Sequence, residues 1–326
     1  MTEKIEVLLI GPPKPVVVDG LTRTFDLVKF SDVKDQEKFF AETAPRIRAI
    51  ACSATSERIP GDLMARFPKL EIVSTFGVGY DHVDSQWAAA HGVVVTNTPD
   101  VLTEEVADTA LGLLLNTVRE FPQAERYLRA GHWRQKDYPL SKASLRNCTV
   151  GLVGMGRIGQ AIARRLDAMR VPVVYHARRP AAGVTYRHYP KLLDMARDVD
   201  VLLVITPGGA ATRNMINAEV LAALGPQGIL INMARGSVVD EDALIRALKD
   251  KTILSAGLDV YLNEPDVPAA LIDMEHVVLF PHVGSASAAT REKMDQLVVD
   301  NLVAWASGKP PLTPVPEAPW PPKKPG

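Results

Sequence analysis

The sequence predicts an α/β protein with two parallel β-sheets, each covered by helices on both faces. Three observations predict this class. Short aliphatic runs alternate with helical patterns, the alternation occurs in two successive series, and a glycine-rich turn opens the second series. The chain has 326 residues, a length that suits about two domains of ordinary size.

The composition excludes several classes of protein. Lys and Arg number 37 and Asp and Glu 38, so we expect no nucleic-acid partner. The longest purely aliphatic run, Val201–Ile205, is far shorter than the roughly 20 residues of a membrane helix, so no membrane association is expected. The N-terminal residues lack the apolar run of a signal peptide, and two cysteines cannot build a disulfide framework. We therefore expect a cytoplasmic protein.

The elements of the first series follow from its aliphatic runs, which are typical of buried parallel strands. The expected strands are Ile5–Ile10, Ile47–Ala51, Ile72–Ser74 and Val93–Thr96. Helical patterns are expected over Asp35–Thr43, Val83–His91 and Thr103–Glu120.

The second series contains six further runs, the number that a complete dinucleotide-binding domain requires. The expected strands are Thr149–Val153, Val173–Tyr175, Val201–Ile205, Ile229–Ile231, Leu254–Leu258 and Val277–Phe280. Apolar residues between Met294 and Trp305 recur at helical spacing. The proline-rich end, Pro310–Pro325, is expected to be an extended segment, either loose or laid over a surface.

The glycine-rich turn follows the expected strand Thr149–Val153 and opens an amphipathic helix, the context in which G-x-G-x-x-G binds a dinucleotide. Its first glycine makes the tight turn, the second lets the backbone approach a pyrophosphate, and the third packs helix on strand. The helix N-terminus would then face the phosphates. The predicted cofactor-binding loop consists of Gly154, Met155, Gly156, Arg157, Ile158 and Gly159.

The turn after the next strand indicates which dinucleotide is bound. An NAD-binding domain places an acid there for the ribose 2′-hydroxyl, whereas this chain has Ala177, Arg178 and Arg179. Two guanidinium groups can hold a 2′-phosphate, so NADP(H) is favoured and NAD(H) is the weaker alternative. A solvated basic turn is the competing interpretation.

Three later strands each end in a segment with one chemically active side chain: Arg235, Glu264 and His282. The carboxyl ends of parallel strands line the ligand crevice of an open sheet, so these groups should face one region. Reduction of a 2-keto acid needs such a set: a cation for the carboxylate and carbonyl, a proton donor, and a carboxylate that keeps the donor charged. Taken singly, each residue could instead be a surface ion pair, a turn residue or a core histidine. The histidines show no metal-ligand spacing, so no metal is expected.

Several motifs together resemble the D-isomer-specific 2-hydroxyacid dehydrogenase family, and within it the NADP-dependent glyoxylate/hydroxypyruvate reductases. The resemblance spans nearly the whole chain. It is carried by the glycine loop, the three segments above, and the stretches Phe76–Asp84 and Asn97–Asp108.

The resemblance implies roles for individual residues. Arg235 would bind the substrate carboxylate and carbonyl, His282 would be the general acid, and Glu264 would favour its charged form. The backbone N–H groups of Val78 and Gly79 would hold the carboxylate, although this loop could also be an ordinary βα turn. The nicotinamide contacts and the crevice lining would come from Thr103, Asp259, Thr206 and Pro207.

The resemblance also implies a domain organisation. Two Rossmann/flavodoxin-like, doubly wound domains would be separated by a cleft. Residues 1–99 and 285–326 would form the substrate-binding domain, and residues 100–284 the dinucleotide-binding domain. The stretch around Trp133 belongs to a dimerisation arm in relatives, so a homodimer is expected.

The favoured hypothesis is an NADPH-dependent reductase of small 2-keto acids. Two alternatives remain open at this point. One is a dinucleotide-sensing interaction protein on the same fold, like the corepressors of this superfamily. The other is a different enzyme of the superfamily, such as a phosphite dehydrogenase.

Overall fold

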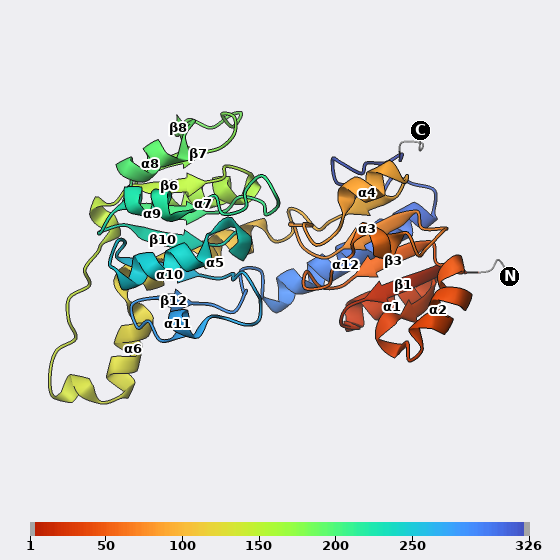
Figure 1. The fold of residues 1–326 in the computed structure, drawn as a ribbon, viewed down its shortest axis with the longest axis horizontal. Helices are drawn as coiled ribbons and strands as arrows, with labels where there is room; N and C mark the ends of the chain where they lie inside the picture. The colour runs from red at the N-terminus through yellow and green to blue at the C-terminus, as the bar shows by residue number, and fades with distance from the viewer. Residues whose placement is uncertain (1–3, 323–326) are drawn as a thin grey trace. The chain divides into compact units, whose positions relative to one another are not determined.

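The computed structural model describes residues 4–322, and these residues form two compact units (Figure 1). The first unit contains the chain up to Leu102 and again from Ser287 onward, and the second is Thr103–Ala286. Across the described residues, no helix is long and apolar enough to cross a membrane.

The first unit is built on a five-stranded parallel sheet in the order β2-β1-β3-β4-β5, the order of flavodoxin-like folds. Helices α1 and α12 pack together on one face, and the core of the other face includes residues from α2, α3 and α4. The strands are β1 (Glu6–Ile10), β2 (Asp26–Lys29), β3 (Ala49–Cys52), β4 (Ile72–Thr75) and β5 (Val94–Thr96). The helices are α1 (Pro15–Thr24), α2 (Gln36–Glu42), α3 (Gly61–Met64), α4 (Ser85–Ala90) and α12 (Ala288–Ala306).

The second unit has a seven-stranded parallel sheet in the order β12-β11-β10-β9-β6-β7-β8. Helices α5 and α7 pack on each other, and the core of the unit includes residues of α8, α9 and α10. The strands are β6 (Val150–Val153), β7 (Val173–His176), β8 (Arg187–Tyr189), β9 (Val201–Val204), β10 (Ile229–Asn232), β11 (Ser255–Leu258) and β12 (Val278–Leu279). The helices are α5 (Thr103–Arg119), α6 (Phe121–Arg129), α7 (Arg157–Ala168), α8 (Leu192–Asp198), α9 (Ala218–Leu224), α10 (Glu241–Lys249) and α11 (Ala269–Ile272).

The predicted fold class, two doubly wound parallel α/β domains, is confirmed. Strands β2 and β8 were not foreseen, and neither were helix α1 and the other helices outside the predicted ranges, α3, α6, α8, α9, α10 and α11. β2 and β8 lie at sheet edges and carry polar residues, so they lack a continuous aliphatic run. Helix α1 begins at Pro15, and the prolines before it resemble a turn, although proline suits the first position of a helix.

The order of each sheet determines where ligands bind, because doubly wound sheets bind them at the carboxyl end where the strand order reverses. In the second unit this point lies between β6 and β9, which pair in parallel from Val150 with Val201 to Val153 with Val204. The glycine loop leaves β6 at this end. It therefore lies at the position where a doubly wound fold binds its cofactor.

Candidate active site

The glycine loop has the geometry that a dinucleotide pyrophosphate requires. Gly154 has a positive φ of 111°, and a Cβ there would come within 2.9 Å of the Ile205 carbonyl oxygen. A Cβ on Gly159 would lie 2.4 Å from the Gly154 carbonyl oxygen, so only glycine allows the helix to pack this closely. A Cβ on Gly156 would meet nothing within 4 Å in the described chain. The middle position thus borders open space at the start of α7, and the residues fit a bound dinucleotide.

The turn after β7 presents two arginines without a competing acid. Both Arg178 and Arg179 are exposed, and within residues 4–322 neither forms an ion pair with a carboxylate. The turn is anchored at its base, because His188 Nε2 lies 2.9 Å from the Ala177 carbonyl oxygen. Guanidinium groups held in this way can grip the 2′-phosphate of NADP.

His282 and Glu264 form a close pair at the carboxyl ends of β12 and β11. The Nδ1 atom of His282 lies 2.6 Å from Glu264 Oε2, a distance typical of a charge-assisted hydrogen bond. About a third of each side chain is exposed to solvent. His282 has a positive φ of 52°, a conformation uncommon for residues other than glycine and one that often marks a functional site. With Nδ1 engaged, Nε2 is the ring nitrogen available for proton exchange with a ligand.

The electrostatic environment keeps Glu264 ionised. Burial opposes its charge, but the hydrogen bond and charge of His282, the backbone N–H of Tyr261 and the nearby Arg235 outweigh this and lower the pKa of Glu264. The Tyr261 N–H donates to Glu264 Oε1 over 3.0 Å. Both carboxylate oxygens are therefore held, one by the backbone and the other by the imidazole.

The loop that carries Arg235 is fixed by contacts on both of its sides. The Nδ2 group of buried Asn232 donates to the Arg235 carbonyl oxygen over 3.1 Å, while its Oδ1 accepts the Ala234 N–H. A Cβ on Gly236 would lie 1.9 Å from the Tyr261 carbonyl carbon, so the two loops approach closely enough to exclude any side chain there. The positive charge of Arg235 also contributes to the lowered pKa of Glu264.

Asp259 anchors the segment that follows His282. Its two carboxylate oxygens accept the N–H groups of Val283 and Gly284 over 2.7 and 2.9 Å. Burial raises the pKa of Asp259, although these N–H groups and the charge of His282 oppose the rise. The side chain thus holds the histidine segment, and each oxygen keeps a lone pair for a further donor such as a carboxamide.

The remaining expected cofactor residues lie at element ends. Thr103 is the first residue of α5 and is partly exposed. Thr206 and Pro207 follow β9, directly after the Ile205 carbonyl that touches Gly154. Within residues 4–322 no cluster of three or more metal-ligating side chains occurs.

In the first unit, the predicted carboxylate loop leaves the carboxyl end of β4. Gly77 has a φ of 110°, and its N–H donates to Thr98 Oγ1 over 2.9 Å. The Val78 carbonyl accepts from Asn97 Nδ2 over 2.8 Å. Within the described residues the N–H groups of Val78 and Gly79 have no acceptor from the chain, so both are free to bind an anion.

Motif reasoning missed the residues that hold these loops. Asn232, Tyr261 and Asn97 act through hydrogen bonds to nearby backbone, and such bonds leave no periodic signal in a sequence. The Tyr261 hydroxyl donates to the Phe280 carbonyl over 2.8 Å and so ties the end of β12 to the Glu264 loop. The only signal for these residues in the sequence was a polar side chain at or shortly after the end of a strand.

The fold and this site define a dinucleotide-dependent oxidoreductase of the doubly wound α/β class. The family model described as "D-isomer specific 2-hydroxyacid dehydrogenase, NAD binding domain" matches residues 111–284. The chain belongs to the D-isomer specific 2-hydroxyacid dehydrogenase family, which confirms the family prediction.

Similar proteins whose names state an activity also support membership of this family. The chain is 52% identical to an NADPH-dependent glyoxylate/hydroxypyruvate reductase from Sinorhizobium meliloti, solved in complex with NADP and malonate. The TM-score is 0.91, and the match covers 97% of this chain and 98% of that one. It is 42% identical to glyoxylate/hydroxypyruvate reductase A HPR2 of Arabidopsis thaliana, over 96% of this chain and 99% of the relative. It is 38% identical to 2-ketogluconate reductase of Gluconobacter oxydans, over 97% and 100%.

Proposed function

We propose that this protein is an NADPH-dependent reductase that converts small 2-keto acids, glyoxylate and hydroxypyruvate among them, to 2-hydroxy acids. The observation that carries the proposal is the 2.6 Å His282–Glu264 pair, with Arg235 near the same carboxylate. The names of the relatives support a reductase and give no support to a sensor protein or a phosphite dehydrogenase.

Two kinds of group would bind the substrate: one charged side chain and two backbone N–H groups. The guanidinium of Arg235 would hold the carboxylate and polarise the keto oxygen, and the free N–H groups of Val78 and Gly79 would bind the carboxylate. We propose accordingly that the first unit is the substrate-binding domain, and that the second binds the dinucleotide.

His282 would supply the proton. NADPH, when bound, supplies the hydride to the keto carbon. The charged imidazole would give the Nε2 proton to the keto oxygen, while Glu264 accepts the Nδ1–H bond and stabilises the positive charge beforehand. The residues proposed to hold the cofactor are Thr103, Gly154, Met155, Gly156, Arg157, Ile158, Gly159, Ala177, Arg178, Arg179, Thr206, Pro207 and Asp259.

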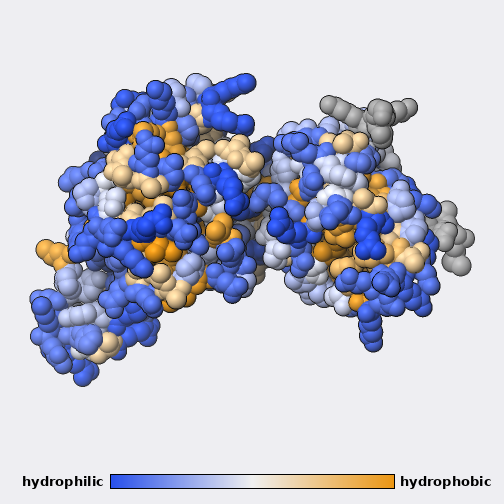
Figure 2. Space-filling model, in the orientation of Figure 1, coloured by the Kyte–Doolittle hydropathy of each residue, from blue (hydrophilic) through white to orange (hydrophobic). Residues whose placement is uncertain are grey.

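The protein is further proposed to be a cytoplasmic homodimer. Large apolar side chains are exposed on the segment from α6 onward: Phe121, Leu128, Trp133 and Leu140, the last 94% exposed. This segment projects from the second unit in Figure 1, whereas most of the surface in Figure 2 is hydrophilic. A second copy would cover the apolar side chains. Both cysteines are free, which suits a reducing compartment.

A turnover panel tests the proposal. Purified protein is assayed with NADPH or NADH against glyoxylate, hydroxypyruvate, pyruvate and a bulkier keto acid. We expect oxidation of NADPH with the small acids. Tight NADPH binding without turnover of any keto acid would instead indicate a sensor, and reduction of NAD(P)⁺ by phosphite would indicate the other enzyme.

The cofactor assignment makes a separate prediction. Losing one charge-assisted contact weakens binding by about 1.5–3 kcal/mol, so Arg178→Ala should raise KM for NADPH at least about tenfold and leave NADH nearly unchanged. Arg197→Ala is a matched control, because Arg197 is an exposed arginine that pairs with Asp194 on α8. Equal losses with both cofactors would refute the 2′-phosphate site.

A further inference from the structure

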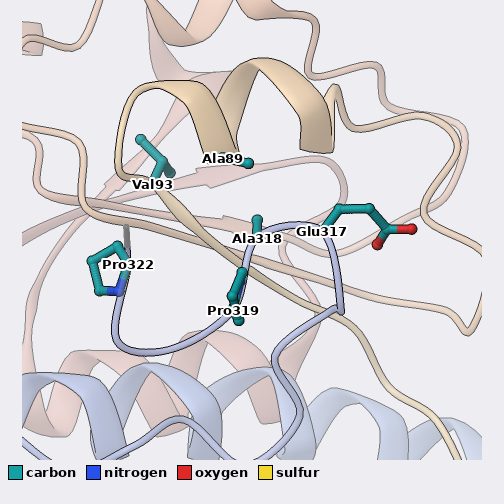
Figure 3. Close-up of a pocket in the computed structure, with 6 residues that line it drawn as sticks. All are labelled: Ala89, Val93, Glu317, Ala318, Pro319 and Pro322. Carbon is teal, nitrogen blue, oxygen red and sulfur yellow. The ribbon is translucent and has the colours of Figure 1, made fainter. Parts of the chain in front are cut away.

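The proline-rich C-terminal segment is an ordered part of the first unit. Residues Thr313–Ala318 run antiparallel to β5, with Val315 N–H donating to the Val95 carbonyl over 2.8 Å and Val95 N–H donating to Ala318 over 3.2 Å. Val315 and Ala318 are buried in the core. Figure 3 shows the segment passing close to α4, with Ala89 and Val93 facing Ala318 across a small hollow and the Glu317 carboxylate extending away from it. Of the two alternatives expected for Pro310–Pro325, the described part is therefore laid over the first unit and is not loose. The last proline of that range, Pro325, lies outside the described residues.

Two side chains of this segment reach the loop after β4 by separate routes. Thr313 Oγ1 donates to the Asn97 carbonyl over 2.6 Å, and Asn97 Nδ2 donates in turn to Val78. Glu317 accepts the Tyr80 hydroxyl over 2.8 Å. The two routes end at Val78 and Tyr80, on either side of Gly79, and the Val78 carbonyl belongs to the same peptide group as the free Gly79 N–H.

Both routes are anchored. Fully buried Asn301 on α12 accepts the Thr313 N–H over 3.0 Å and donates to Thr313 Oγ1 over 2.9 Å, which fixes the threonine hydroxyl. Burial and the Glu317 carboxylate raise the pKa of Tyr80 to about 12, so its hydroxyl stays protonated as a donor throughout the neutral range.

We propose that the segment Thr313–Ala318 positions the loop Phe76–Tyr80 for binding the substrate carboxylate, with Thr313 and Glu317 as positioning residues. The inference rests on the proposed role of Val78 and Gly79. Its physical basis is preorganisation, because N–H groups held in place before binding lose less entropy when they close on an anion.

The test separates this role from general stability. Thr313→Val removes the hydroxyl at nearly constant shape, Thr313→Ser restores it, and exposed Leu312→Ala on the same segment is the control. For Thr313→Val we expect KM for glyoxylate to rise about two- to tenfold, with kcat and the Kd for NADPH little changed. Thr313→Ser and Leu312→Ala should behave like the unmodified protein. Tyr80→Phe, which breaks the other route, should also raise KM.

Hydrogen exchange distinguishes failure of this inference from failure of the proposed function. The Gly77 N–H, bonded to Thr98, reports opening of the loop. In Thr313→Val we expect faster exchange there. Unchanged exchange and unchanged KM in both Thr313→Val and Tyr80→Phe would overturn the positioning role while leaving the reductase assignment intact. Faster exchange with unchanged KM would instead overturn the substrate role of the loop, and the inference with it.

Discussion

Replacing His282 with alanine should lower kcat for glyoxylate reduction by a factor on the order of 10²–10⁴, because the reaction loses its proposed general acid. Its Nδ1 is committed to Glu264 at 2.6 Å, so in the proposed mechanism Nε2 is the nitrogen left to serve the substrate. The Kd for NADPH, measured by fluorescence titration, should change little, since the ring is assigned to chemistry and not to the phosphates.

Two further variants control this experiment. His282 has a positive φ of 52°, which asparagine tolerates better than alanine, so His282→Asn removes the acid with less backbone strain. His276→Ala removes an exposed histidine at the other end of β12 and should leave kcat unchanged. If His282→Asn turned over glyoxylate within about threefold of the unmodified rate, another group would have to donate the proton.

Replacing Arg235 with alanine should lower kcat/KM by a factor of roughly 10²–10³ or more. In the proposed mechanism the guanidinium binds the substrate carboxylate and stabilises the charge that develops on the keto oxygen. Loss of a single hydrogen-bond donor to such a developing charge typically lowers the rate by about 10²–10³. Arg235→Lys keeps the charge but loses the planar fork, so its activity should lie in between.

Chemical rescue makes the Arg235 prediction sharper. Added guanidinium ion should restore part of the activity of Arg235→Ala, and it should not activate the control Arg246→Ala, in which an exposed arginine on α10 is removed. A loss that appears mainly as weaker NADPH binding would contradict the assignment, because it would place Arg235 in the cofactor site.

How far the sequence predicts this molecule depends on the kind of interaction. The buried strands β1, β3 and β9 consist almost entirely of apolar residues and could be identified. Edge strand β8, Arg187-His188-Tyr189, has no such run, and its pairing with β7 depends on tertiary packing.

In the candidate site, too, some features could be predicted from the sequence and others depend on tertiary packing. Arg235, Glu264 and His282 could be named because each follows a strand, and parallel strands bring their carboxyl ends to one edge. The distance between His282 and Glu264 could not be predicted, since it depends on the Tyr261 N–H, the closeness of Gly236 and the grip of Asp259 on Val283 and Gly284. Asp259 was expected to touch the nicotinamide, and its hold on the backbone was not foreseen.

The pH dependence of reduction tests the central claim, that the carboxylate of Glu264 supports His282 as the proton donor. The pKa of Glu264 is lowered, so its carboxylate is ionised through the neutral range and loses its charge only in acid. Above that point the ionised carboxylate accepts the Nδ1–H of His282 and can stabilise positive charge on the ring. Reduction should therefore persist near neutral pH and fall at higher pH, and oxidation of the 2-hydroxy acid should show the opposite limb.

The decisive measurement is the pH profile of kcat/KM for glyoxylate in the unmodified protein and in Glu264→Gln, with exposed Glu275→Gln as the control. Glutamine keeps the shape and removes the charge, so the fall in reduction should move to lower pH while the control keeps the original profile. A folded Glu264→Gln protein whose profile coincided with that of the unmodified enzyme would contradict the coupling, and Glu264 would then be only a turn residue before Pro265.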